Sequence, residues 1–337
     1  MQLVAYGAQD IYLTGNPQIT FFKVVYRRHT NFSVECIQQT FNGQWTAGIS
    51  NVTATISRNG DLISNMHLDV LLPTSAPSAL GGVITNGNQV ANTAYANWCR
   101  NTGHALIDTV ELEIGGQMID KHYGHWLDVW RELTDHDGKE DSMVNVQRTN
   151  GYFTAPVADR GGANPAYGGG ALPNGNVQLP SLQLYIPLKF WFNRNPGLAL
   201  PLIALQYHEV KLKIRSRALN TLINAGGLPQ ANQCRVGTAA AIIPGNPTRA
   251  NLWVDYIYLD TDERRRFAQQ SHEYLIEQLQ FERNGLAVGA NTVRLNLNHP
   301  VKELIWTVQA NAVFAATAHG ATVRCDAVFN DYRTNTA

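Results

Sequence analysis

The sequence predicts an all-β protein with two tandem β-sandwiches, of which the second is incomplete within these 337 residues. Three observations predict this fold. Apolar residues recur at every second position in several separate segments, which is the period of strands with one buried face. A pattern of strand, turn and strand occurs twice along the chain, which indicates an internal repeat. Long segments rich in Gly, Pro and Asn separate the strands, and connections of this length are uncommon unless they carry function or are disordered.

The clearest alternation lies in the middle of the chain. Apolar residues occupy alternate positions over residues 182–192 and again over residues 210–215. Each segment therefore predicts a strand with one buried face. The connection between them includes residues 198–205, which are too apolar for an ordinary surface loop. We expect two core strands joined by a buried connector, with Phe190 in the core.

The same reasoning assigns the remaining elements of the first sandwich. Strands are expected at residues 32–41, 52–57, 62–72, 109–114, 117–123 and 252–259. Trp126, Val129, Trp130 and Leu133 lie at helical spacing, so residues 125–133 predict a short amphipathic helix at one end of the sheets. Extended loops are expected at residues 73–101, 150–180 and 218–250.

A short helix at residues 261–268 marks the expected domain junction. Asp260 and Glu263 have the spacing of a capping box at its start. Beyond it, residues 276–285 resemble residues 34–43, and in both places an alternating strand, a turn and an apolar strand follow. We therefore predict an N-terminal arm at 1–30, a first sandwich at 31–262 and the start of a second at 263–337. Residues 310–337 resemble a loop more than strands, so we expect the second sandwich to be truncated here.

Composition argues against several classes of protein. Lys plus Arg and Asp plus Glu are equal at 26 each, so no net field attracts the chain to nucleic acid or to an anionic membrane. The four cysteines form no Cys-x-x-Cys pair, which favours a reducing compartment. The chain contains no signal peptide and no apolar run of about 18 residues, so it is expected to be soluble and made in the cytosol.

Signatures of enzymes and metal sites are also missing from the sequence. His208 and His272 each begin a His-Glu pair of the metalloprotease type, but Leu212 and Ile276 occupy the positions of the second histidine. Neither a Gly-x-Ser-x-Gly elbow nor a phosphate-binding loop is present. Two other groups that could hold an ion are more simply explained as a polar helix flank and a turn: His122 with His125, and residues 135–138. We expect no catalytic residues, no metal and no cofactor.

Two groups of residues are candidates for assembly contacts. Phe21 and Phe22 precede Arg27 and Arg28 in the N-terminal arm, an apolar segment that ends in positive charge. This arm docks either on its own domain or on a neighbouring subunit or underlying layer. The second group is Arg264, Arg265 and Arg266, which either pair with carboxylates of a neighbour or form a solvated helix face.

Several long blocks of sequence carry a resemblance to a known family. They are Gly-Ala-Gln-Asp at 7–10, Leu-Thr-Gly-Asn-Pro-Gln-Ile-Thr-Phe-Phe at 13–22, residues 189–212, residues 254–267 with their Asp-Glu-Arg-Arg-Arg run, and Asn-His-Pro-Val-Lys-Glu-Leu-Ile-Trp at 298–306. In these blocks the chain resembles the major capsid protein of the nucleocytoplasmic large DNA viruses, which include the phycodnaviruses, iridoviruses and mimiviruses. The resemblance implies a double jelly roll, three copies of which form a pseudo-hexagonal capsomer in an icosahedral shell over an internal membrane.

The resemblance also implies partners and a location. The arm at 7–28 would lie at the capsomer base facing the interior, and the three long loops would include the outward turrets. The partners would be further copies of the chain in a homotrimer and in neighbouring capsomers, minor capsid proteins and the internal membrane, without direct contact to nucleic acid. The chain would be a structural virion protein, assembled in the host cytoplasm, and not an enzyme.

Other functions remain open from the residues alone. A jelly-roll carbohydrate-binding module would use exposed Trp45, Trp98, Trp126 or Trp130 to stack on sugars, unless these are core or interface aromatics. A β-sandwich hydrolase would depend on a single His or Asp. Within the capsid reading, the chain could instead be a minor or penton-type paralogue.

Overall fold

The computed structural model describes residues 30–73, 95–99, 101–135, 143–144, 181–226, 234–235, 245–286 and 292–308. Its strands are β1 Phe32–Gln39, β2 Phe41–Asn42, β3 Asn51–Thr55, β4 Leu62–Leu72, β5 Tyr95–Trp98, β6 Ile107–Ile114, β7 Gln117–Tyr123, β8 Leu182–Pro187, β9 Leu200–Pro201, β10 Val210–Ser216, β11 Ile223–Gly226, β12 Cys234–Arg235 and β13 Arg249–Leu259. Its helices are α2 Thr102–Leu106, α3 Gly124–Thr134, α4 Trp191–Arg194 and α5 Thr261–Gln269, with 3₁₀ turns η3 Pro196–Leu198 and η4 Leu219–Leu222.

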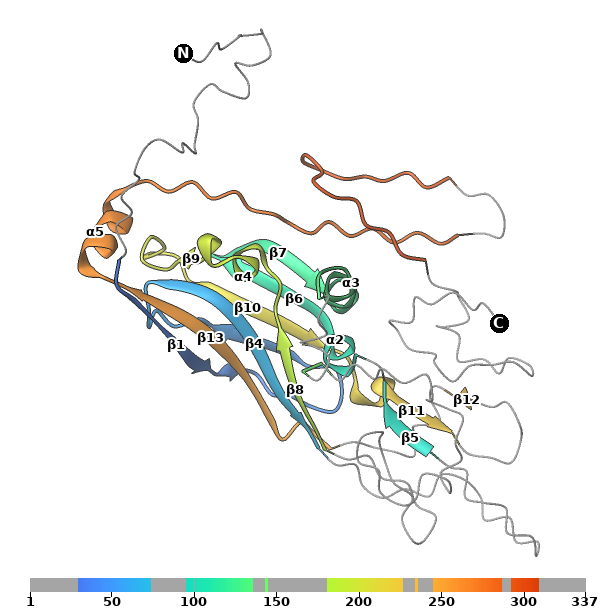
Figure 1. Ribbon diagram of the computed structural model, residues 1–337. Helices are drawn as coiled ribbons and strands as arrows, with labels where there is room; N and C mark the ends of the chain where they lie inside the picture. The colour runs from blue at the N-terminus through green and yellow to red at the C-terminus, as the bar shows by residue number, and fades with distance from the viewer. Residues whose placement is uncertain are drawn as a thin grey trace, which may run out of the picture.

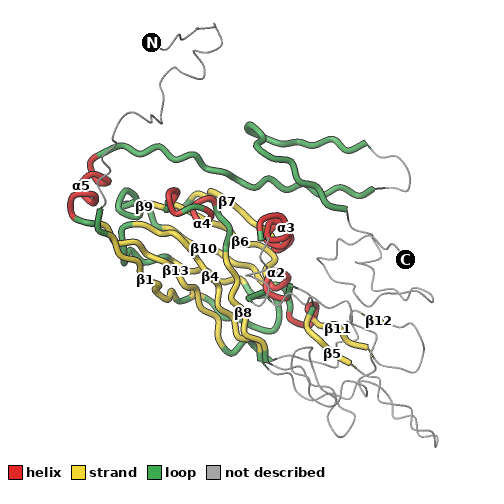
Figure 2. The backbone as a smooth tube through the Cα atoms, in the orientation of Figure 1, coloured by secondary structure: helices red, strands yellow, loops and turns green. Residues whose placement is uncertain are grey.

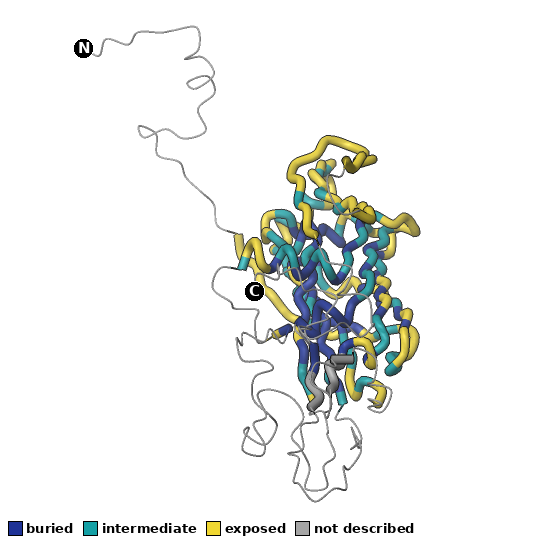
Figure 3. The backbone as a smooth tube through the Cα atoms, turned by 90° about the vertical axis from the view of Figure 1, so that its right-hand side faces the viewer, coloured by how far each residue is buried: buried dark blue, intermediate teal, exposed yellow. Residues whose placement is uncertain are grey.

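Two antiparallel sheets face each other and enclose the core (Figure 1). In the first, which we call sheet A, the strand order is β1-β13-β4-β8, and β9 also pairs with β4. In the second, sheet B, the order is β2-β3-β10-β6-β7. Buried residues are concentrated between the two sheets (Figure 3). This arrangement confirms the predicted first β-sandwich.

The core follows from the alternation in the sequence. Leu68 and Val70 of β4 and Leu212 and Ile214 of β10 are among its buried residues. β4 lies between β13 and β8, and β10 lies between β3 and β6, so both strands are central in their sheets. β4 spans the predicted residues 62–72, and β10 confirms the second strand of the middle stretch.

The first strand of the middle stretch is shorter than predicted. β8 ends at Pro187, which pairs with His67 in the last position of the register, and residues 191–194 form the helical turn α4. Proline has no N–H to continue a ladder, so pairing stops there. Phe190 and Phe192 are nevertheless buried, which means that their alternation reflects burial of a turn rather than a strand. The connector is buried as predicted, since Leu200 and Leu202 belong to the core.

Helix α3 is present where it was predicted, but it turns a different face to the core. Its buried side chains include Leu127, Asp128 and Arg131, whereas Trp126 and Trp130 are only half-buried. Asp128 accepts a hydrogen bond from the Asn101 amide and lies 3.6 Å from the His104 ring, so its burial is compensated by polar partners. The helix itself is confirmed, and its buried face differs from the apolar positions in the sequence because their spacing does not anticipate a polar contact between α2 and α3.

The predicted long loops contain regular structure. β5 lies within the predicted loop at 73–101, and η4, β11 and β12 lie within that at 218–250. β5, β11 and β12 form a small third sheet beside the sandwich, visible at one end in Figures 1 and 2. The predicted loop at 150–180 lies outside the described residues.

The second half of the chain differs from the first. α5 begins after Asp260, whose carboxylate accepts a hydrogen bond from Thr261 N at 2.7 Å, as expected for an N-cap. The described residues after it, 270–286 and 292–308, contain no helix or strand, so the predicted second set of strands is not formed there. They run extended (Figure 2). The Gln280 side chain bonds both the N–H and the carbonyl of Asn298.

Among the described residues, no helix is long and apolar enough to cross a bilayer.

Candidate assembly surface

The predicted assembly residues fall into two groups in the structure. Phe21, Phe22, Arg27 and Arg28 lie outside the described residues. The three arginines lie on α5, directly after β13, and all three are exposed. Arg264 pairs with Asp61 at 3.0 Å, and Arg266 contacts the Gln270 side chain at 3.4 Å. The structure therefore places the arginines at one end of sheet A but gives them no shared partner.

Asp61 fixes α5 to the first sandwich. One of its carboxylate oxygens accepts hydrogen bonds from Leu259 N at 2.8 Å and from the Arg264 guanidinium at 3.0 Å. Its backbone N–H also donates to Ile257 O at 3.0 Å. Because Asp61 directly precedes β4, these bonds join the start of one central strand to the end of its neighbour β13. The first turn of the second half is thereby held in a defined position.

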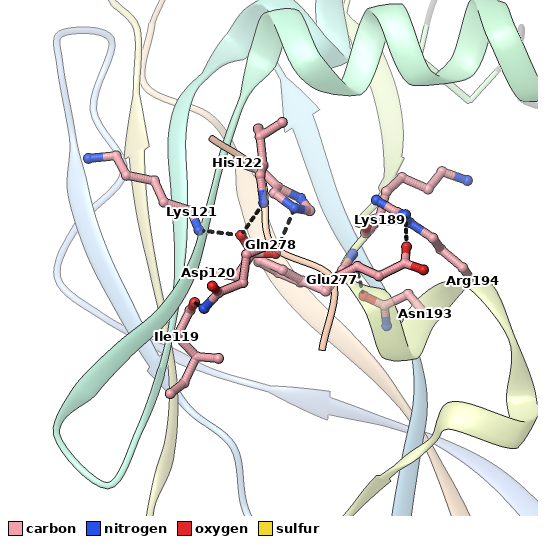
Figure 4. Close-up of polar contacts among 11 residues, drawn as sticks. Ile119, Asp120, Lys121, His122, Lys189, Asn193, Arg194, Glu277 and Gln278 are labelled. Atoms are coloured by element: carbon pink, nitrogen blue, oxygen red, sulfur yellow. Dashed lines mark hydrogen bonds and ion pairs between the residues drawn. The ribbon is translucent and has the colours of Figure 1, made fainter. Parts of the chain in front are cut away.

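A second attachment joins the two halves of the chain across β7. Residues 277–281 pass along the free edge of this strand, and we call their contacts with β7 and α4 the seam (Figure 4). The Gln278 amide donates to Ile119 O, and Leu279 N donates to the Asp120 carboxylate at 3.2 Å. Polar bonds from the second half thus cover an edge that would otherwise be open.

A buried contact between a carboxylate and an imidazole ring underlies the seam. Asp120 Oδ2 lies 2.9 Å from His122 Nε2, and both side chains are almost completely buried. The other Asp120 oxygen accepts from Lys121 N at 2.9 Å and from Leu279 N. The His122 ring stacks on Phe190 with centroids 4.5 Å apart. A carboxylate buried in this way requires several partners, and one of them comes from the second half of the chain.

Arg194 of α4 completes the seam. Its Nη1 donates to Glu277 Oε2 at 2.9 Å, its Nε donates to Lys189 O at 3.2 Å, and the guanidinium lies 4.1 Å from the centroid of the Trp130 ring. Burial lowers the pKa of Arg194 and the Glu277 carboxylate opposes this shift. An arginine that binds a carboxylate in its plane and an aromatic ring on its face is well suited to an interface.

Sequence reasoning missed the seam. It explained His122 as a polar helix flank, but His122 and Asp120 belong to β7 and point into the core. The signal that could have found them is their spacing. They occupy alternate positions of a predicted strand on its buried face, where polar residues need partners from elsewhere in the chain.

The described residues offer little for catalysis. They contain no group of three or more His, Cys, Asp or Glu residues that could hold a metal. Burial raises the pKa of the Cys99 thiol to about 12, and partial burial together with Asp255 raises that of Cys36 to about 12. Both thiols are therefore protonated at neutral pH and weak nucleophiles. The His272 ring has a hydrogen-bond partner nearby in the sequence, since its Nε2 lies 2.7 Å from Phe267 O.

The four tryptophans considered for sugar stacking do not form one shared surface. Trp98 is buried. Trp45 packs edge to face on Phe41 with centroids 5.7 Å apart, and Trp126 contacts Trp130 at 5.4 Å. Trp98 is thus a core residue, and the other three are half-buried.

Comparison with known proteins finds family matches over almost the whole chain. Residues 20–260 match the family model described as the major capsid protein N-terminus, and residues 263–335 match the large eukaryotic DNA virus major capsid protein. The chain is 48% identical over 320 residues to the major capsid protein of Phaeocystis pouchetii virus, covering 93% of this chain and 58% of that one. It is 46% identical to capsid protein 1 of Acanthamoeba polyphaga mimivirus, covering 92% of this chain and 48% of the relative.

A solved structure agrees with the sequence relatives. The crystal structure of PBCV-1 VP54, fitted into a reconstruction of the virophage Sputnik, superposes with a TM-score of 0.52 at 36% identity, over 77% of this chain and 50% of that chain. This chain therefore spans about half to two thirds of the length of the proteins it matches. The family models match most of the chain on both sides of α5. The chain belongs to the major capsid protein family of large eukaryotic DNA viruses, whose fold is the double jelly roll.

Proposed function

We propose that this chain is the building block of a viral shell, in which three copies form a pseudo-hexagonal capsomer of an icosahedral capsid. The observation that carries this proposal is the match to capsid family models on both sides of α5, over residues 20–260 and 263–335. Two sandwiches in each chain make three copies equivalent to six similar units. A homotrimer can therefore occupy a position of sixfold shape in a lattice.

The seam and the Asp61 anchor support this role. A capsomer needs the two sandwiches of each copy in a fixed relation, because a closed ring tolerates little variation in the angle between its units. Arg194, Asp120 and Asp61 each bind a residue of the second half, namely Glu277, Leu279 and Arg264. These bonds restrain the start of the second half against the first sandwich.

Burial of apolar surface would drive assembly. Obligate interfaces bury about 2,000 to 5,000 Å², and at about 25 cal/mol per Å² of apolar area the gross stabilisation is tens of kcal/mol before the entropy of association is subtracted. Lys plus Arg and Asp plus Glu are equal at 26 each, so many copies can pack together without strong mutual repulsion.

The remaining parts of the proposal concern the surroundings of the capsomer. The N-terminal arm at 1–30 would face the shell interior, where an internal membrane and minor capsid proteins are the expected contacts. Assembly would take place in the host cytoplasm, and no direct contact with nucleic acid is expected. The domain division at 31–262 and 263–337 belongs to the same proposal.

Native mass spectrometry and light scattering of full-length protein test the proposal directly. We expect a stable trimer, and a protein that stays monomeric at all accessible concentrations would refute it. The copy number of the chain in purified virions separates a major capsid protein, present in most capsomers, from a minor or penton-type paralogue.

A further inference from the structure

The two outer faces of the first sandwich differ in chemistry. On sheet B, charged side chains pair across neighbouring strands. Lys121 Nζ lies 2.7 Å from Glu111, and Lys213 pairs with Glu113. Such pairs are compatible with a face that remains in contact with water.

At its β1 end, the outer face of sheet A is apolar instead. Phe32 and Val34 of β1 point away from the core and are 69% and 56% exposed. They lie opposite Leu259 and Ile257 of β13 in the register, so the four side chains form one continuous cluster that we call the outer patch. Farther along the same face, Trp253 is half-buried and Tyr185 is exposed. Exposed apolar surface of this kind marks an interaction site.

Among the residues that the structure describes, nothing pairs with the edge of sheet A next to the outer patch. β1 is eight residues long and contains neither Lys nor Pro, the residues that usually protect an edge strand. Within the described residues, no backbone–backbone hydrogen bond reaches its free edge. The other long edges differ, because Met143 O accepts from Tyr185 N of β8 at 2.9 Å and the seam covers β7. β2, the remaining edge, has only two residues.

The size of this face suits a stable interface. The strands β1, β13, β4 and β8 have 8, 11, 11 and 6 residues, and their average of 9 corresponds to a length of about 30 Å at about 3.3 Å per residue. Four strands about 4.8 Å apart make a width of about 19 Å, so the flat face measures about 570 Å². Two such faces bury about 1,140 Å² in total, which exceeds the value of about 1,000 Å² expected of a specific interface.

We propose that the outer face of sheet A, centred on the outer patch and the open edge of β1, binds a second copy of this chain. This inference rests on the proposed self-assembly and assigns a surface to it. A membrane is a poorer occupant, because lipid cannot satisfy the backbone groups of an open strand edge, whereas another protein copy can. The rest of the face is polar, with Asp255 opposite Cys36 of β1 and Arg249 paired with Asp69 at 3.1 Å. A polar surround of this kind resembles the rim of a protein interface around an apolar centre.

A double variant tests the surface without disturbing the core. Phe32→Glu with Val34→Glu places two carboxylates on the outer patch, and both positions are more than half exposed in the single chain. The matched control is Met118→Glu, because Met118 lies on the outer face of sheet B and is 59% exposed. Circular dichroism should show unchanged unfolding for both. By sedimentation equilibrium of full-length protein, we expect the dissociation constant to rise at least about 100-fold in the double variant and to stay unchanged in the control.

The outcomes separate this inference from the proposed function. If the wild type and the double variant assemble equally well, the inference is wrong and self-assembly stands. If the wild type itself is monomeric, the proposed function fails together with the inference. Hydrogen exchange of the β1 amides adds a second readout, and we expect fast exchange in the monomeric variant and protection in the assembled wild type. Protection of β1 in a monomer would mean that the chain covers this face itself, and binding of wild type to lipid vesicles that the variant loses would assign the face to a membrane. Either result would overturn the inference.

Discussion

Replacing Asp120 should weaken the attachment of the second half of the chain more than any other single change in the seam. Its carboxylate lies 2.9 Å from His122 Nε2 and accepts hydrogen bonds from Lys121 N at 2.9 Å and Leu279 N at 3.2 Å. Asp120→Ala leaves the Leu279 N–H and the buried His122 ring without this partner. A buried polar group that loses its partner costs about 1 to 3 kcal/mol, and this change removes the partner of the Leu279 N–H and of the His122 ring together.

We therefore expect Asp120→Ala to lower the free energy of unfolding by about 3 to 5 kcal/mol, measured by urea denaturation. The control is Asp120→Asn, which keeps an oxygen to accept from Leu279 N and loses only the carboxylate oxygen facing His122. It should cost about 1 to 2 kcal/mol. The two variants together distinguish the hydrogen bond that crosses the seam from the contact between Asp120 and His122 beneath it.

A local measurement identifies where the energy is lost. Arg283 is exposed just beyond the seam, so trypsin cleavage after it reports how often residues 277–281 detach from β7. Cleavage should be faster in Asp120→Ala than in Asp120→Asn. If Asp120→Ala loses less than about 1 kcal/mol and is cleaved at the wild-type rate, the seam does not hold the two halves together.

Three further predictions concern the first sandwich and α5. Phe190→Asp places a charge among fully buried residues, so we expect it to unfold the first sandwich, and a folded variant by circular dichroism would contradict its place in the core. Arg264→Ala removes the bond to Asp61 and should cost about 1 kcal/mol in thermal or urea unfolding, whereas Arg265→Ala on the same helix should change stability by less than about 0.5 kcal/mol. Burial lowers the pKa of His125 to about 4, so the unfolded chain takes up a proton first as the pH falls. Stability should therefore be full above about pH 6.5 and decrease as the pH falls toward 4, and His125→Gln should reduce this dependence.

The strands of the first sandwich were predictable because the alternation of apolar residues within each strand indicates which of its side chains face the core. In β10 the alternation of apolar residues matches the alternation of buried ones, since the strand is central and has one face on the core. In β4 the alternate apolar residues from Met66 to Leu72 are also buried, although Asp69 between them is buried as well. The turn at Phe190 was not predictable in the same way. Burial at every second position arises there from a helical turn that follows Pro187. Spacing alone cannot distinguish such a buried turn from a strand.

Polar contacts between distant segments account for most of the remaining differences. Helix α3 turns Asp128 inward because Asn101 and His104 of the preceding segment contact its carboxylate, and the Arg131 guanidinium lies 4.0 Å from the same carboxylate. The seam requires residues 277–281 to reach β7 across more than 150 positions of sequence. The residues around Asp120 and those around Leu279 contain no signal that these two residues are in contact in the fold. Such pairings depend on the completed fold.

The contrast between the two sheet faces argues for an interface more strongly than exposed apolar residues alone. Isolated apolar side chains are common on protein surfaces and carry little meaning. Here one face provides the comparison for the other, because both belong to the same sandwich. On sheet B, Glu111 and Lys121 occupy the outward positions of neighbouring strands, whereas Val34 and Ile257 occupy the equivalent positions at the β1 edge of sheet A. Charged side chains occur farther along sheet A, where Arg249 pairs with Asp69. The chain therefore concentrates charged pairs on sheet B and leaves the β1 end of sheet A apolar, which is the pattern expected where that end is covered by a partner.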